Sequence, residues 1–386
     1  MRRVYLDHNA STPVHPEVAK AMLPYFTEAF GNPSSIHGFG REARDAVEAG
    51  REMIARFLGV NPEEIVFTSG GTESDNLAIK GVAFARERPG HVITTPIEHH
   101  AVLRTCEALE RQGWSVTYLP VDGHGLVDPD DARRAIRPDT VLISVMHANS
   151  EVGTIEPVEE IAAVAREASI PFHVDGVQTF GKLPVRPREM GLTLLAISSH
   201  KIYGPKGVGA VWIRRGTRMV GIQHGGDHER RRRAGTENVA GIVGFAAAVA
   251  IRSREMGDEA VRLGGLRDRL WGGIQERVTD VRLNGHPTRR LPSTLNVSFK
   301  GIESESLILG LDLKGIGISA GSACSSGNLE PSYVLTAMGI PADLGMAAAR
   351  FSLGRGTSAD EIGYVLEILP GVVERLRALS PTGAKS

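Results

Sequence analysis

The residues best suited to chemistry lie in short polar segments that follow apolar runs. Lys201 ends the segment Ser198-Ser199-His200-Lys201, directly after an apolar run and before a turn rich in Gly and Pro. A lysine held beside apolar or cationic groups has a lowered pKa and can form a Schiff base with a carbonyl compound. An ordinary surface lysine is the alternative, and Lys206 is a rival for the role.

A second polar segment, residues 173–178, has the sequence HVDGVQ. His173 and Asp175 are two residues apart on an expected strand, so both should point to the same face. A carboxylate there could keep a pyridinium nitrogen protonated, which makes pyridoxal phosphate (PLP) a better electron sink. Gln178 could donate to the phenolic oxygen of that ring. A simple capping aspartate is the alternative interpretation of Asp175.

A third segment, residues 69–75, has the sequence SGGTESD. It predicts the end of a strand, a turn at two glycines, and a helix that begins at Thr72. The T-x-x-D pattern from Thr72 to Asp75 is typical of a capped helix start. Free backbone N–H groups at such a start also suit a phosphate.

The two cysteines have different surroundings. Cys324 lies in residues 319–328, a segment of Gly, Ser and Ala that offers little to bury a thiol. Such a loop can carry a reactive group between sites, whereas an incidental exposed cysteine is the alternative. Cys106 has helical core spacing with Val102 and Leu109, so we predict a structural role. Two cysteines without a CxxC spacing predict neither a disulfide framework nor a zinc site.

These segments need a scaffold, and the chain predicts one in which strands and helices alternate. The expected strands are residues 64–68, 91–95, 140–146, 171–175 and 192–198, and the expected helices are 72–88, 98–111 and 161–168. This alternation favours a mostly parallel sheet covered by helices. The polar segments follow the strands, which is where such a sheet binds ligands.

From about residue 260 the pattern changes to that of a smaller α+β domain. We expect helices at 259–278, 332–338 and 360–379, and strands at 294–299, 316–319 and 348–353. The N-terminal residues could add a first strand or strap to this domain.

The composition excludes several classes of protein. The chain has 386 residues, 41% of them apolar, and a net charge of -1. That is enough for two domains or one large one, and the balanced charge gives no reason to expect nucleic acid or membrane partners. No apolar run reaches the roughly 18 residues of a spanning helix, and no secretory signal is recognisable. We therefore expect a cytoplasmic protein, with the arginine run 230–233 in a solvated loop.

Taken together, the segments resemble the cysteine desulfurases of the NifS/IscS type, within the PLP-dependent class V aminotransferase group. The resemblance covers nearly the whole chain, at residues 5–7, 30–33, 67–80, 98–99, 147–153, 173–178, 200–207, 225–237, 321–335 and 350–354. It implies the α/β PLP-dependent transferase fold type I. Residues 15–258 would form a large PLP-binding domain with a mostly parallel seven-stranded sheet. Residues 1–14 and 259–386 would form a small α+β domain that carries the Cys324 loop.

The resemblance also implies a role for individual residues. Lys201 would bind PLP covalently and move the substrate proton, Cys324 would accept the sulfur, and His99 would stack on the ring as a candidate acid. The other implied cofactor contacts are Gly71, Thr72, Asn149, Asp175, Gln178, Ser198 and His200, with Thr236 reaching the cofactor phosphate of the neighbouring subunit. Arg350 and Asn149 would bind the substrate.

The activity implied by the resemblance is conversion of L-cysteine to L-alanine. The sulfur would be held as a persulfide on Cys324 and passed to acceptors such as iron–sulfur cluster scaffolds or tRNA thiolation proteins. A homodimer with shared sites is expected. No metal is expected, although Cys324 could be a transient iron–sulfur ligand. A selenocysteine lyase, another fold type I aminotransferase and a non-enzymatic sulfur acceptor or scaffold protein are the alternatives.

Overall fold

The structure is a computed structural model that describes residues 2–320 and 331–379. Its centre is a seven-stranded sheet in the order β2-β8-β7-β6-β5-β3-β4. The strands are β2 (Ile65–Thr68), β3 (His91–Thr94), β4 (Ser115–Tyr118), β5 (Thr140–Ser144), β6 (Phe172–Asp175), β7 (Leu194–Ser198) and β8 (Gly209–Ile213). Strand β8 runs antiparallel to both of its neighbours, and the other pairings are parallel. The predicted fold class, α/β with a mostly parallel seven-stranded sheet, is confirmed.

The strand residues alternate between two layers of helices, as the two-residue period of a strand requires. Ile65 and Phe67 pack into the cluster that includes α3 (Gly38–Leu58) and α7 (Val158–Glu167), whereas Val66 packs into the cluster on the opposite face. That face is covered by α4 (Gly71–Ala83) and α5 (His100–Glu110). Cys106 of α5 lies fully buried there, so its predicted structural role in the core is confirmed. The shorter helices are α1 (Pro16–Met22), α2 (Pro24–Thr27), α6 (Pro129–Ala135) and α8 (His228–Arg231).

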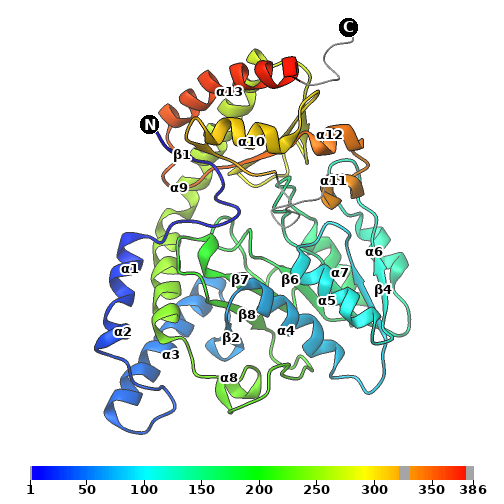
Figure 1. Cartoon of the computed structure of the whole chain (residues 1–386). Coiled ribbons are helices and arrows are strands. Elements are labelled where there is room, and N and C mark those ends of the chain that lie inside the picture. The colour runs from blue at the N-terminus through cyan, green and yellow to red at the C-terminus, as the bar shows by residue number, and fades with distance from the viewer. Residues whose placement is uncertain (1, 321–330, 380–386) are drawn as a thin grey trace.

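A smaller α+β unit lies above the sheet in Figure 1. It contains the antiparallel strands β9 (Val281–Asn284), β10 (Thr294–Phe299) and β12 (Ala348–Ser352), in the order β12-β10-β9. Its helices are α10 (Ser304–Asp312), α11 (Tyr333–Ala337), α12 (Ala342–Met346) and α13 (Ala359–Leu379).

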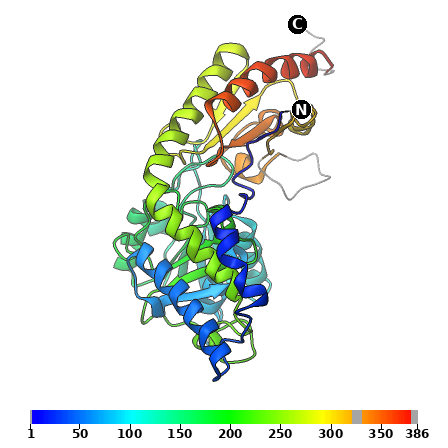
Figure 2. The same ribbon diagram turned by 90° about the vertical axis from the view of Figure 1, so that its left-hand side faces the viewer.

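The N-terminal residues link this unit to the large sheet. Strand β1 (Val4–Tyr5) pairs in parallel with β11 (Ile316–Gly317), which confirms the expected N-terminal strap. The chain then descends toward the large sheet (Figure 2). On this path the N–H of Thr12 donates to the carbonyl of His200. Residues 7–12 therefore lie between the two units, beside the end of β7.

Helix α9 (Val239–Arg277) runs the height of the molecule, and it is longer than expected because it begins at Val239 rather than at residue 259 (Figures 1 and 2). Phe245 packs into the core of the large sheet and Leu270 into that of the smaller unit. The expected division into residues 15–258 and residues 1–14 with 259–386 stays a prediction, because one continuous helix crosses the boundary. In the described ranges, no helix is long and apolar enough to cross a membrane.

Candidate active site

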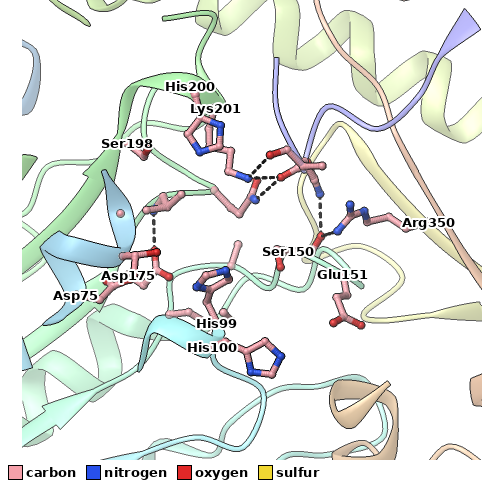
Figure 3. A pocket seen from close by; sticks show the side chains of 18 of the residues that line it. Asp75, His99, His100, Ser150, Glu151, Asp175, Ser198, His200, Lys201 and Arg350 are labelled. Carbon is pink, nitrogen blue, oxygen red and sulfur yellow. Dashed lines mark hydrogen bonds between the residues drawn. The ribbon is translucent and has the colours of Figure 1, made fainter. Parts of the chain in front are cut away.

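A cavity of about 340 Å³ opens where the carboxyl ends of the strands meet the N-terminal strap and β12 (Figure 3). Its volume lies in the range of small-molecule sites. Among the residues predicted from the sequence, it is lined by Gly71, Thr72, His99, Asp175, Gln178, Ser198, His200, Lys201 and Arg350. Residues that are far apart in the chain are thus brought to one place.

Lys201 ends a short 3-10 helix (Ser199–Lys201) directly after β7. Its Nζ donates to the carbonyls of Asn9 and Ala10, the latter at 2.8 Å. Burial, assisted by the charge of Arg350, lowers the pKa of Lys201 to about 8. A larger fraction of this amine is therefore neutral near pH 7 than for an ordinary lysine, as a nucleophile requires. The rival Lys206 is exposed and does not line the cavity.

Asp175 ends β6 and is buried at the floor of the cavity. Its Oδ1 accepts a hydrogen bond of 2.9 Å from the N–H of Val177. Burial raises the pKa of Asp175, and the nearby His99 and Lys201 oppose this rise. A cationic partner in the cavity would therefore stabilise the ionised carboxylate.

His173 precedes Asp175 by two residues and points to the same layer, as predicted. Its Nε2 lies 3.5 Å from Oδ1 of Asp75 in α4. Burial lowers the pKa of His173 to about 3 and raises that of Asp75. Burial thus disfavours the charged form of each group.

The start of α4 differs from the prediction. The helix begins at Gly71, with Gly70 as its N-cap at a φ of 153° and no side-chain cap. The predicted cap by Thr72 with Asp75 is wrong, because Thr72 lies inside the first turn and Asp75 is buried. The N–H groups of the first turn therefore have no side-chain acceptor, and they can bind an anion.

The rest of this corner of the cavity is also polar. The buried Ser198 hydroxyl has no hydrogen-bond partner in the described residues. At Gly71, a Cβ atom would lie 2.7 Å from Cγ2 of Val177, so a larger side chain would push into the wall of the cavity. His200 lines the same cavity.

His99 is the N-cap of α5, and its ring reaches the cavity. Its Nδ1 accepts from the N–H of Ala101 at 3.1 Å, so the neutral ring carries its proton on Nε2. Desolvation lowers the pKa of His99, an effect that Asp175 opposes. The neutral ring can stack on a planar ligand and present one N–H donor.

Arg350 extends from β12 into the cavity from the side of the smaller unit (Figure 3). Its Nη2 donates to Asp7 at 2.7 Å and its Nη1 to the carbonyl of Ser150 at 3.1 Å. Its buried Nε has no partner in the described residues. The guanidinium is therefore held in place and retains a donor for a carboxylate. No role was predicted for Asp7 from the sequence, although it lies in the matching segment 5–7.

Two predicted residues lie outside this cavity. The Asn149 amide donates to the carbonyl of Ile97 at 3.0 Å and accepts from the N–H groups of Glu151 and Val152. Thr236 is exposed and does not line the cavity. Their contacts with cofactor, substrate or a second subunit stay predictions. Cys324 lies outside the described residues.

The loop that leads to Thr236 has three consecutive residues with positive φ: Glu229 (44°), Arg230 (55°) and Arg231 (64°). Such backbone is costly for residues with a Cβ atom. The buried Glu229 carboxylate holds it, because it pairs with Arg51 at 2.7 Å and accepts from the N–H of Phe67 at 2.8 Å.

Replacing Glu229 by Gln should lower the free energy of unfolding by about 3 kcal/mol, because it removes the buried one of the two carboxylates that pair with Arg51 and leaves only the half-exposed Glu48. Urea unfolding at one fixed protein concentration measures this change. As a matched control, Glu167→Gln removes a carboxylate from an ion pair with Arg133, in which both side chains are more than half exposed. It should cost less than about 1 kcal/mol. Equal losses in the two variants would contradict this account.

Comparison with known proteins identifies the class of enzyme to which this fold belongs. The architecture is that of the PLP-dependent enzymes of fold type I. Residues 4–365 match the family profile described as Aminotransferase class-V. A solved structure titled "NIFS-LIKE PROTEIN" superposes with a TM-score of 0.92 at 39% identity, over 97% of this chain and 100% of that one.

Curated relatives identify the type of enzyme within this class. The chain is 53% identical to the cysteine desulfurase IscS of Dictyoglomus turgidum, over 98% of this chain and 97% of the relative. It is 51% identical to the cysteine desulfurase IscS of Methanosarcina thermophila, over 100% and 95%. A structure titled "SspA in complex with cysteine" matches at 39% identity with a TM-score of 0.81, covering 91% of this chain and 98% of that one. The chain therefore belongs to the NifS/IscS-type cysteine desulfurases of the class-V aminotransferase family.

Proposed function

We propose that this cysteine desulfurase binds PLP in the cavity, converts L-cysteine to L-alanine and holds the removed sulfur as a persulfide on Cys324. The observation that carries the proposal is the convergence of an amine, a carboxylate and an uncapped helix start on one cavity. Lys201, Asp175 and the first turn of α4 all line it. These are the groups that suit the aldehyde, the ring nitrogen and the phosphate of PLP.

The residues present fit this cofactor. The unpartnered Ser198 hydroxyl lies beside the uncapped start of α4, where a phosphate needs donors. Asp175 is buried, so its carboxylate needs a positive partner such as a protonated ring nitrogen. When bound, PLP supplies an electron sink for the substrate α-carbon.

Individual residues of the chain would then have separate roles in the reaction. Arg350 holds the substrate carboxylate, and the neutral Lys201 amine removes the proton from the α-carbon. The Cys324 thiolate attacks the substrate sulfur, so that an S–S bond forms while the C–S bond breaks. The Nε2–H of His99 is the candidate donor for the proton that completes alanine. The electron pair of the broken C–S bond stays on the carbon that this proton joins. Lys201 returns the proton that it removed to the α-carbon, which completes the atoms of alanine.

The experiment that tests this function follows the purified protein with PLP and L-cysteine. Visible absorbance should show bound PLP, and alanine and persulfide should form in equal amounts in a single turnover without reductant. Alanine formation without persulfide would contradict the proposed role of Cys324, and the absence of both products would contradict the activity.

A homodimer with shared sites is part of the proposal. Large apolar side chains in residues 23–39 are exposed, namely Leu23, Phe26, Phe30, Ile36 and Phe39. Exposed apolar patches mark interaction surfaces. A second copy of this chain would cover this patch, and Thr236 would reach the partner's cavity. A fully active monomer at high dilution would contradict this placement.

The sulfur acceptors we propose are iron–sulfur cluster scaffolds or tRNA thiolation proteins. A cytoplasmic location agrees with this use, because thiols and persulfides persist in a reducing compartment. Adding a candidate acceptor to the persulfide form should transfer the sulfur to the acceptor.

Replacing Arg350 by Lys should lower kcat/KM for L-cysteine by about 10²-fold, because a lysine cannot form the bidentate pair with a carboxylate. Initial rates of alanine formation measure this ratio. Arg355→Lys is the matched control, because Arg355 pairs with Glu255 at the surface, outside the cavity lining. Comparable losses in both variants would contradict a carboxylate-binding role of Arg350.

A further inference from the structure

A second lysine lies behind Lys201. Lys182 lies seven residues after the end of β6, and its Nζ donates to Oε1 of Gln178 at 2.9 Å. Lys182 and Lys201 also line a common small cavity of about 20 Å³, on which Arg252 and Glu259 lie too. This space is distinct from the main cavity, which Lys182 does not line. The activity described above leaves Lys182 without a role.

The contact fixes the orientation of the Gln178 amide. The Asn9 carbonyl can only accept and the Lys182 ammonium can only donate, so the two contacts together turn the Gln178 oxygen to Lys182 and the NH₂ group to Asn9. That group donates to the carbonyl of Asn9 at 3.1 Å. The Asn9 carbonyl also accepts from Nζ of Lys201. A chain of hydrogen bonds thus joins Lys182, Gln178, Asn9 and Lys201.

Asn9 is a fixed member of this chain. Its side-chain Nδ2 donates to the carbonyl of Ser150 at 3.0 Å and to Oγ1 of Thr294 at 2.9 Å, and its own N–H donates to Ser352. The Asn9 carbonyl therefore has a defined place between the two lysines. The Gln178 NH₂ group has two hydrogens and uses one of them on this carbonyl. The other can serve a ligand, since Gln178 lines the main cavity.

On the basis of the proposed function, we propose that Lys182 is a positioning residue of the PLP site. It holds the Gln178 amide in the orientation that presents an N–H, and not an oxygen, to an acceptor on the bound cofactor. Burial and the charge of Lys201 lower the pKa of Lys182 to about 7, and both protonation states of its amine can donate to Gln178. Without Lys182 the buried Gln178 oxygen loses its donor, and the side chain can turn away from the cavity.

The test compares Lys182→Met and Lys182→Arg with the wild-type chain. Lys182→Met should raise the equilibrium dissociation constant for PLP about tenfold, which is the effect of one lost hydrogen bond. It should also shift the visible absorption of bound PLP. Lys182→Arg retains a donor and should recover most of both properties. Wild-type affinity and absorption in Lys182→Met would overturn the proposal.

A matched control separates this role from a general effect of losing a lysine. Lys80 donates to Oδ1 of Asn76 at 2.9 Å, with the same four-residue spacing, on a part of α4 outside the cavity. Lys80→Met should leave PLP affinity and absorption unchanged. An equal loss in Lys80→Met would overturn the specific role of Lys182.

A double-mutant cycle tests the route through Gln178. If Lys182 acts by holding that amide, then Lys182→Met should have little further effect on PLP affinity in a Gln178→Ala background. Fully additive losses would overturn the route. Far-UV circular dichroism of the PLP-free variants checks that they fold. Alanine formation by the wild-type chain tests the proposed function independently.

Discussion

Replacing Lys201 by Ala should lower the rate of alanine formation from L-cysteine by at least about 10⁴-fold, because in the proposed function one amine would serve both as the covalent attachment of PLP and as the base. The structure supports both roles, since Lys201 lines the cavity and its pKa of about 8 leaves part of the amine neutral. Single-turnover measurements of alanine give the rate. Reduction with borohydride, followed by peptide mapping, shows whether PLP is attached to the chain.

Lys206→Ala is the matched control for this prediction. Lys206 lies five residues further along the chain but is exposed and outside the cavity lining. It should retain the wild-type rate and the attached PLP. Normal attachment of PLP in Lys201→Ala would contradict the account and would make Lys206 the attachment site.

Replacing Cys324 by Ala should leave PLP binding and the visible absorption unchanged, but should abolish persulfide formation and lower alanine release from L-cysteine by at least about 10³-fold. The reason is that no other nucleophile would accept the substrate sulfur. An aminotransferase of the same fold would be insensitive to this change. Unchanged release of alanine and sulfide would therefore favour that alternative.

Cys106→Ala is the matched control, because Cys106 is the other cysteine of the chain. Burial raises the pKa of the Cys106 thiol to about 12, so it stays protonated and unreactive at neutral pH. The Cys106→Ala variant should form persulfide at the wild-type level. Loss of persulfide in this variant would contradict the division of roles between the two cysteines.

The positions of Lys201, Asp175 and Gly71 could be predicted because each follows an apolar strand at the carboxyl edge of the sheet. Parallel strands bring those edges together, so local sequence was sufficient to place these residues in one site. The same logic identified β5, β6 and β7, which are buried on both faces. It did not identify β4, whose residues lie at the exposed edge of the sheet, or β8, which follows a Gly/Pro turn and reverses direction.

The contacts of the N-terminal strap could not be predicted from local patterns. Asp7 pairs with Arg350 and the Asn9 carbonyl accepts from Lys201, across sequence separations that no periodicity encodes. The cap of α4 was misassigned for a related reason. Thr72 and Asp75 have the residue types of a cap, but tertiary packing buries Asp75 beside His173 and leaves Gly70 at the cap. Such burial depends on neighbours from another strand.

The transfer of sulfur to Cys324 is the central claim, and mass spectrometry of the peptide that contains this residue tests it most directly. After incubation of the PLP-bound protein with L-cysteine, without reductant, this peptide should gain the mass of one sulfur atom, and the Cys106 peptide should not. An unmodified Cys324 peptide in a sample that has formed alanine would contradict the claim.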